Sequence, residues 1–343
     1  MKIVKELICL VLFVIWMLFS LDVLGRIFTP KWLTNKDNSH TYISKGFYDE
    51  EKNSLDVLFL GNSDVYRGVS PIEIYKNTGI TSYNYVASGE RIWTGYYLLL
   101  EALERQEPNV IVLNVDGIFS SSHSSFANYR KAFDNMKFGK NKIRAINDDA
   151  FDFNFVKRVS FYLPIFNYHS RYSELNKNDF KYAFSKLHNS YKGLDMTTVR
   201  VAPSKTFDLD GAKISDKAME YLNKIKDECA KREIELVLMW LPSLDSYSKE
   251  RGKVIAGYAL ENSLPFLDLN LNYKSFGLDF KEDSSDGGDH LNVYGAEKVS
   301  KYIGEYLVKN YSFSKHDKSV IDIWDRDVKI YDEGKKELQV SER

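Results

Sequence analysis

Residues 57–64 read Val-Leu-Phe-Leu-Gly-Asn-Ser-Asp, and this stretch decides the fold class of the chain. The run from Leu55 to Leu60 is apolar apart from one Asp, which is typical of a strand buried on both faces. Gly61 begins a small polar turn, and Ser63 follows the strand directly. The stretch therefore predicts a buried parallel strand that presents a serine at its carboxyl end.

The same pattern recurs along the chain in alternation with helical spacing. Apolar runs at residues 80–86, 109–115, 235–241 and 265–269 predict further strands. Apolar residues from Ala218 to Cys229 recur at helical spacing, and similar stripes lie between the other strands. This alternation predicts an α/β fold with a doubly wound parallel sheet, in which ligands bind at the carboxyl ends of the strands.

Composition narrows the class of function. The chain has 343 residues, a net charge of -1 and 44% hydrophobic residues, so a large core is possible and nucleic acid is not an expected partner. Cys9 and Cys229 lack metal-ligand spacing and are not expected to pair. The sequence contains no nucleotide-binding glycine loop and no zinc helix, so we expect no cofactor.

The first 28 residues predict a transmembrane anchor. An unbroken apolar run from Leu7 to Leu21 continues towards Phe28, close to the ~20 residues that a span requires. No small-residue cleavage site follows, which favours a retained anchor over a removable signal peptide. Basic residues flank the run on both sides, so charge does not fix its orientation.

The rest of the chain divides into a connector, one large domain and a tail. Residues 29–54 have the character of a polar connector, and the α/β alternation occupies residues 55–310. Residues 117–210 interrupt it with an aromatic, basic stretch that predicts a helical or irregular insertion, or a cap over the site. We interpret residues 311–343 as a charged C-terminal tail. The many aromatic residues are expected to pack, with a carbohydrate-facing surface as the alternative.

A second motif supplies the partners that a serine needs. Residues 283–295 read Asp-Ser-Ser-Asp-Gly-Gly-Asp-His-Leu-Asn-Val-Tyr-Gly, an acidic loop that presents His290 before a helix. Serine is a weak nucleophile and requires a base and an orienting carboxylate. His290 would be the base for Ser63, and Asp286 or Asp289 the carboxylate. We prefer Asp286, because adjacent residues rarely place their side chains in contact. The combination predicts ester hydrolysis or acyl transfer.

The base, the loop carboxylates and the serine each have an alternative interpretation. His169, in the insertion, is the rival base. Asp283, Asp286 and Asp289 would alternatively bind a divalent cation, but their spacing does not match the EF-hand loop, so no metal site is predicted. The Gly-x-Ser-x-Gly elbow is not met, because Val65 stands where it needs glycine.

These blocks resemble those of the SGNH/GDSL hydrolase superfamily. Gly-Asn-Ser63-Asp resembles the serine block, Ser88-Gly89 the glycine block, and the loop ending at His290 the final Asp-x-x-His block. With its anchor, the layout is similar to membrane-anchored bacterial SGNH proteins such as those of alginate O-acetylation and teichoic-acid D-alanyl transfer. The resemblance covers about residues 55–310 and implies a flavodoxin-like sheet.

The resemblance also implies roles for individual residues. His290 would deprotonate Ser63, and the N–H groups of Ser63 and Gly89 would hold the oxyanion. The usual Gly-x-Asn-Asp block is absent, which leaves Asn114 as a weak third donor; losing such a donor typically costs ~10²–10³ in rate. The acid is out of register, since Gly287 stands three residues before His290.

The implied function is that of a membrane-anchored serine esterase or O-acyltransferase. It would act through an acyl-serine on acyl esters of cell-envelope or exported polysaccharide, with its catalytic domain outside the cytoplasm. A multispanning membrane acyltransferase is the expected protein partner. The alternatives are a carbohydrate esterase or lipase-like hydrolase, and a non-catalytic envelope scaffold with a decayed SGNH fold.

Overall fold

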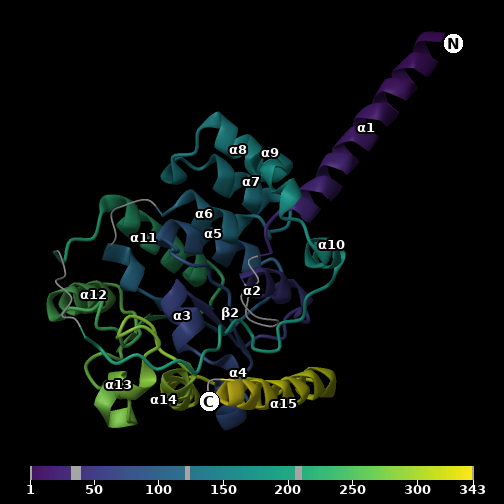
Figure 1. Ribbon diagram of the computed structural model, residues 1–343. Coiled ribbons are helices and arrows are strands. Elements are labelled where there is room, and N and C mark those ends of the chain that lie inside the picture. The colour runs from purple at the N-terminus through teal and green to yellow at the C-terminus, as the bar shows by residue number, and fades with distance from the viewer. Residues whose placement is uncertain (1, 32–39, 120–123, 205–210, 342–343) are drawn as a thin grey trace.

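The computed structural model describes residues 2–31, 40–119, 124–204 and 211–341 (Figure 1). Parts of the predicted connector and insertion lie outside these ranges. One sheet contains the strands β1 (Val57–Leu60), β2 (Ser82–Asn84), β3 (Val110–Asn114), β4 (Glu235–Trp240) and β5 (Phe266–Asp268). All neighbours are parallel, in the order β2-β1-β3-β4-β5. This is the flavodoxin-like order, so the predicted doubly wound sheet is confirmed.

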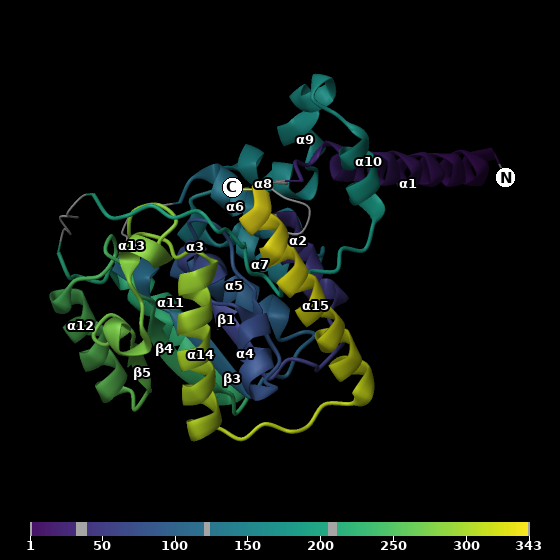
Figure 2. The ribbon, with the colours of Figure 1, turned by 60° about the horizontal axis from the view of Figure 1, so that its bottom comes forward.

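Helices cover both faces of the sheet, as Figure 2 shows. The helices, including the short 3₁₀ helices labelled η, are α1 (Lys2–Phe28), α2 (His40–Gly46), η1 (Phe47–Asp49), α3 (Ser63–Gly68), α4 (Pro71–Thr78), α5 (Ile92–Ala102), η2 (Asp116–Phe119), α6 (Phe126–Phe133), α7 (Lys140–Asn147), η3 (Asp149–Phe151), α8 (Phe155–Tyr162), α9 (Ile165–Tyr168), η4 (His169–Ser173), α10 (Lys177–Phe184), α11 (Asp216–Lys231), α12 (Lys249–Glu261), η5 (Tyr273–Phe276), α13 (Phe280–Asp283), α14 (Val293–Asn310) and α15 (Lys318–Ser341).

The central strand β1 shows why its sequence is apolar at every position. Side chains alternate across a strand, so Leu58 and Leu60 enter the core beneath α5 and α11. Val57 and Phe59 enter the opposite core beneath α4 and α14. All four are fully buried, and each such side chain contributes about 1.5–3 kcal/mol by leaving water.

The register of the strands sets the position of the site. β1 pairs with both β2 and β3, and Leu58 lies opposite Tyr83 on one side and Ile111 on the other. The chain therefore leaves these three strands at the same edge of the sheet. The residues that follow, including Ser63, Gly89 and Asp116, are brought to one end of the molecule.

The predicted insertion is largely helical and contributes aromatic side chains to the core of the domain. Phe133, Phe151, Phe153 and Phe161 are all buried, and they join the core that lies beneath α5. The rings of Phe151 and Phe153 stack with their centroids 5.3 Å apart. Packing therefore accounts for this part of the aromatic content.

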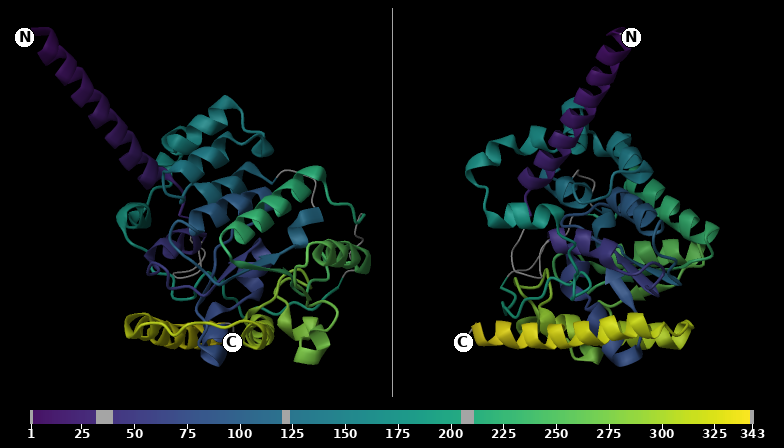
Figure 3. Two further views of the ribbon diagram at one scale, coloured as in Figure 1. Left: turned by 180° about the vertical axis from the view of Figure 1, so that it is seen from behind. Right: turned by 90° about the vertical axis from the view of Figure 1, so that its right-hand side faces the viewer.

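The N-terminal helix α1 projects away from the domain (Figure 3). It has 27 residues and contains an apolar window with a mean hydropathy of 2.7, none of which is buried. By length and composition, α1 is able to cross a membrane.

The charged segment at the C-terminus ends in a long helix that packs on the domain. Helix α15 lies against α4 and buries Trp324, Asp327 and Tyr331. The high charge of residues 311–343 predicts a tail rather than a packed element. Most of these residues are indeed polar or charged, but the few apolar ones recur at helical spacing and form a buried stripe.

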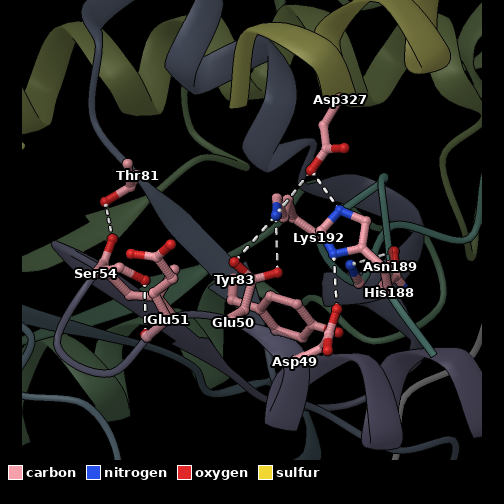
Figure 4. A network of polar contacts seen from close by, with 12 residues as sticks. Asp49, Glu50, Glu51, Ser54, Thr81, Tyr83, His188, Asn189, Lys192 and Asp327 are labelled. Carbon is pink, nitrogen blue, oxygen red and sulfur yellow. Dashed lines mark hydrogen bonds and ion pairs between the residues drawn. The ribbon is translucent and has the colours of Figure 1, made fainter. Parts of the chain in front are cut away.

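A buried polar network holds α15 in place (Figure 4). The ammonium of Lys192, which is fully buried, lies 2.8 Å from Glu50 Oε1 and 2.9 Å from Asp327 Oδ2. The Nε2 atom of His188 lies 2.7 Å from the same Asp327 oxygen. The network thus links the first segment of the domain, the end of the insertion and the last helix.

Candidate active site

Ser63 is the first residue of α3 and is partly exposed at the carboxyl edge of β1. The preceding Asn62 caps the helix, and its side-chain oxygen accepts the N–H of Asp64 at 3.0 Å. Gly61 has a φ of +148°, and a Cβ there would lie 2.7 Å from Val65 Cγ2. Only glycine fits this turn, which sends the chain from the strand into the helix that carries the serine.

His290 is held by Asp286 through two hydrogen bonds. The ring Nδ1 lies 2.5 Å from Asp286 Oδ2, and the backbone N–H of His290 donates to Oδ1 at 2.8 Å. Gly287 and Gly288 have φ values of +96° and +118°, and this glycine turn folds Asp286 back onto the ring. The hydroxyl of Ser284 accepts the N–H of Gly288 at 2.6 Å and fixes the turn.

Asp289 also reaches the ring of His290. Its Oδ2 lies 3.2 Å from the same Nδ1 atom, so the expectation that adjacent side chains would not meet is wrong here. Both carboxylates face Nδ1, which favours a proton on that nitrogen and leaves Nε2 to accept one. Asp286 makes the shorter contact and the additional backbone bond.

The electrostatics of the loop suit a base that becomes charged. Burial lowers the pKa of His290, but the hydrogen bond to Asp286 and the charges of both carboxylates outweigh it and raise the pKa overall. Burial opposes ionisation of Asp286, yet its hydrogen bonds with His290 lower its pKa. For Asp289, burial dominates and raises the pKa to about 6.

The ring of His290 faces the start of α3. Its Nε2 lies 3.6 Å from Oδ1 of Asp64, the residue after Ser63. Within the part of the chain that the structure describes, the Ser63 hydroxyl makes no hydrogen bond, so it is not engaged by His290 in this state. Catalytic hydrogen bonds are often long in a free enzyme and tighten when substrate binds.

Asp64 and Asp116 also lie at the site, although neither is among the predicted catalytic or oxyanion-hole residues. Asp64 is 7% exposed. Burial, followed by the charges of Asp116 and Asp289, raises its pKa well above the usual range and favours the neutral acid. Asp116 follows β3 at the same edge. The signal in the sequence that indicates both residues is their position just after a predicted strand.

The structure ties the candidate Asn114, and also Asn62, to Asp116. Asn114 donates from Nδ2 to Asp116 Oδ1 at 2.6 Å, and its Oδ1 accepts the Leu241 N–H at 3.0 Å. Asn62 donates to the other Asp116 oxygen at 2.5 Å. Asn114 therefore lies at the expected edge, but its side chain already links β3 to the end of β4.

Gly89 follows β2 with a φ of +60°. A Cβ at this position would lie 2.2 Å from Asn128 Nδ2, so a side chain has no room. Its carbonyl accepts the Ser124 hydroxyl at 2.6 Å, while its N–H has no acceptor among the described residues. The N–H of Ser63 is likewise without an acceptor there, so within the described part of the chain neither of these two backbone donors is engaged.

The other predicted alternatives lie elsewhere or have other partners. His169 is exposed in the insertion and contacts the carbonyl of Phe166. Asp283 is buried and is bound by Lys298 at 2.7 Å, so it does not join the loop carboxylates. Asp64, Asp289 and His290 each place one potential ligand atom within 4.8 Å of the others, a grouping that would use the histidine itself.

Comparison with known proteins adds two distant structural likenesses. No family model matches the chain, and no curated protein matches it in sequence. It is similar to a GDSL-like lipase from Bacteroides thetaiotaomicron VPI-5482, with 12% identity, 79% of this chain and 98% of that chain covered, and a TM-score of 0.39. It is also similar to a proposed acylhydrolase from Bacteroides fragilis NCTC 9343, with 12% identity, 81% and 99% covered, and a TM-score of 0.39. The case for function therefore rests on the geometry of the site.

Proposed function

We propose that the chain is a membrane-anchored serine esterase or O-acyltransferase of the SGNH type. The observation that carries the proposal is the carboxylate–imidazole pair of Asp286 and His290, whose Nε2 faces the helix start that bears Ser63. A doubly wound sheet with ligands at its carboxyl edge is the setting in which such a site is expected.

In the first half-reaction, His290 Nε2 takes the Ser63 proton while Oγ attacks the acyl carbonyl. The N–H groups of Ser63 and Gly89 stabilise the oxyanion, and the neutral form of Asp64 avoids adding a negative charge beside it. The imidazolium, stabilised by Asp286, then protonates the leaving alcohol. An acyl-serine remains, and water or an acceptor hydroxyl releases it through the reverse proton transfers.

The proposed substrates are acyl esters of cell-envelope or exported polysaccharide. Helix α1 supports a fixed place at the membrane, and we place the catalytic domain on its extracytoplasmic side, where a multispanning acyltransferase would supply acyl groups. The hydrolytic alternative uses the same residues with water as the acceptor.

The test is trapping of the acyl-enzyme on the full chain in detergent. Incubation with an activated short-chain acetyl ester should add one acetyl group to Ser63, detected by peptide mass spectrometry. Ser63→Ala should remain unlabelled with an unchanged melting temperature. Adding an oligosaccharide acceptor then separates transfer from hydrolysis. Absence of acylation, together with wild-type ester turnover no higher than that of Ser63→Ala, would point to the non-catalytic scaffold instead.

The side of the membrane on which the catalytic domain lies can be tested separately. Cys229 is buried, which raises its pKa to about 12 and makes it inert to thiol reagents, and Cys9 lies within α1. Leu260, which is 82% exposed, is therefore a clean position for a reporter. In intact cells, Leu260→Cys should react with a membrane-impermeant maleimide; labelling only after lysis would reverse the proposed orientation.

A further inference from the structure

A cavity of about 620 Å³ lies at the base of α1. Its lining combines residues of α1, α2 and η1 with residues of the insertion, including α7. Helices α9 and α10 pack against α1 at the same level, and the insertion helices surround the base of α1 in Figure 1. If α1 crosses a bilayer, this cavity opens at the depth of the lipid headgroups. The proposed reaction does not use the residues that line this cavity.

Five lysines line the cavity and give it a positive charge: Lys31, Lys45, Lys137, Lys142 and Lys186. The acidic residues in the same lining are engaged by other groups. Arg26 binds Asp22 at 2.8 Å, Arg130 binds Asp134 at 2.8 Å, and His188 lies 3.3 Å from Asp49.

Three of these lysines contact neutral groups. Lys45 donates to the Tyr182 carbonyl at 3.1 Å, and Lys142 donates to the Met136 carbonyl at 3.2 Å. Lys137 lies over a tyrosine ring, 4.5 Å from its centroid. Burial lowers the pKa of Lys45 and of Lys142 to about 8, and for Lys142 the nearby charge of Asp134 opposes this shift without cancelling it.

Two further donors in the lining have no acceptor in the described chain. These are Nδ2 of Asn135 and Nε of Arg105, both fully buried. Arg105 does donate to the Glu50 carbonyl, but through NH2 at 3.0 Å. Both atoms are shielded from the cavity, so the charge of its lysines carries the argument: several ammonium groups match a ligand with negative charge and acceptor oxygens.

Exposed apolar side chains also line the cavity. Phe138 and Phe184 belong to the lining and are 74% and 58% exposed, and the end of α1 contributes to the same lining. Residues 137–188 contain ten Lys and Arg against five Asp and Glu, in a chain whose total charge is -1. A basic recess with exposed apolar side chains at the end of a spanning helix suits an amphiphile with an anionic head.

We propose that this cavity binds the phosphate headgroup of an anionic phospholipid, with its acyl chains lying along α1. The site would hold the domain in a fixed orientation on the membrane. The inference rests on the proposed membrane anchoring, but it concerns a cavity distinct from the Ser63 site.

The test compares two triple variants of the full chain in detergent. Lys45→Gln, Lys137→Gln and Lys186→Gln remove cavity charges, whereas Lys157→Gln, Lys177→Gln and Lys181→Gln remove the same charge from insertion positions outside the lining. The probe is a fluorescent short-chain phosphatidylglycerol, with phosphatidylcholine as the zwitterionic control. We expect the cavity variant to lose at least tenfold in affinity and the matched control to stay within twofold of the wild type.

Several outcomes would overturn the proposal. Equal binding of both lipids, or equal loss in both triple variants, would show that no specific headgroup site exists. Tight binding of soluble glycerol phosphate would assign a free phosphate ligand. Melting temperatures identify any variant that fails to fold. Carbonate extraction tests the anchor separately: extraction of the wild type would contradict membrane anchoring, while lipid affinity in detergent still reports on the cavity.

Discussion

Two imidazole–carboxylate pairs in this chain have nearly the same contact distance and different surroundings. Nδ1 of His290 lies 2.5 Å from Asp286, and Nε2 of His188 lies 2.7 Å from Asp327. Asp327 is fully buried and also binds Lys192 at 2.9 Å. Asp286, in contrast, is 40% exposed at the edge of the sheet.

The two histidines also differ in the contacts of their second ring nitrogen. His188 Nδ1 lies 3.3 Å from Asp49, so both of its nitrogens contact carboxylates. His290 Nε2 is 3.6 Å from Asp64, beyond hydrogen-bond distance, and faces the segment that carries Ser63. A histidine whose two nitrogens both contact carboxylates acts as a structural clamp, whereas one whose second nitrogen faces the segment that bears a serine is suited to proton transfer.

Replacing each histidine by glutamine should separate the two pairs most strongly. We expect His290→Gln to lower kcat by about 10⁶-fold, because nucleophile and base act as a unit. His188→Gln should keep kcat within about twofold and reduce the free energy of unfolding by about 1–3 kcal/mol. Ester turnover and urea unfolding measure the two effects. Similar activity losses in both variants would remove the distinction.

The two carboxylates on His290 provide the next largest difference. Asp286→Asn should lower kcat by about 10⁴-fold, as expected when the orienting acid becomes an amide. Asp289→Asn should cost about tenfold at most, since it leaves the shorter contact and the backbone bond intact. Steady-state kinetics on both variants decides between them, and the reverse ranking would make Asp289 the acid.

On the structural side, Lys192→Met should act on stability alone. It leaves Glu50 and Asp327 buried without their shared cation, which typically costs about 3–5 kcal/mol. Denaturant unfolding should show this loss while kcat at a temperature below the transition stays unchanged. A change in kcat in a fully folded variant would mean that the network also affects the site.

The smallest expected effect is a shift in pH dependence. His290 must be neutral to act as a base, and its raised pKa keeps it protonated to higher pH. The rise of kcat/KM with pH should therefore have its midpoint above about 6.5, the usual pKa of histidine. Asp289→Asn removes one negative charge that raises this pKa. The rise should therefore move to lower pH, by about one unit at most. The His188→Gln profile should match the wild type.

The sheet could be predicted from the sequence because its signals are local. Each strand is a short apolar run followed by a turn residue, and β1 to β5 all fall inside the predicted segments. The order of the strands could not be read in this way, since pairing depends on contacts between distant segments. Helix α15 was missed as a packed element because its charged residues outnumber the stripe formed by residues such as Trp324 and Tyr331.

The candidate site was predictable only in part for the same reason. Ser63 and His290 stand beside distinctive glycine-containing turns, which a reader of the sequence can recognise. Burial, followed by the charges of Asp116 and Asp289, raises the pKa of Asp64, and none of these relations is visible along the chain. That Asp286 makes the shorter contact with the ring depends on the backbone angles of Gly287 and Gly288, which set the direction of the turn.

The buried ammonium of Lys192 has a consequence for the synthesis of the protein. Its partner Asp327 emerges from the ribosome more than a hundred residues later, so the central fold must form with an incompletely compensated charge until α15 arrives. Contacts this distant in sequence slow folding. A chain released before residue 327 would retain every residue of the candidate site and still lack the helix that completes its core, which makes it a ready substrate for cellular proteases.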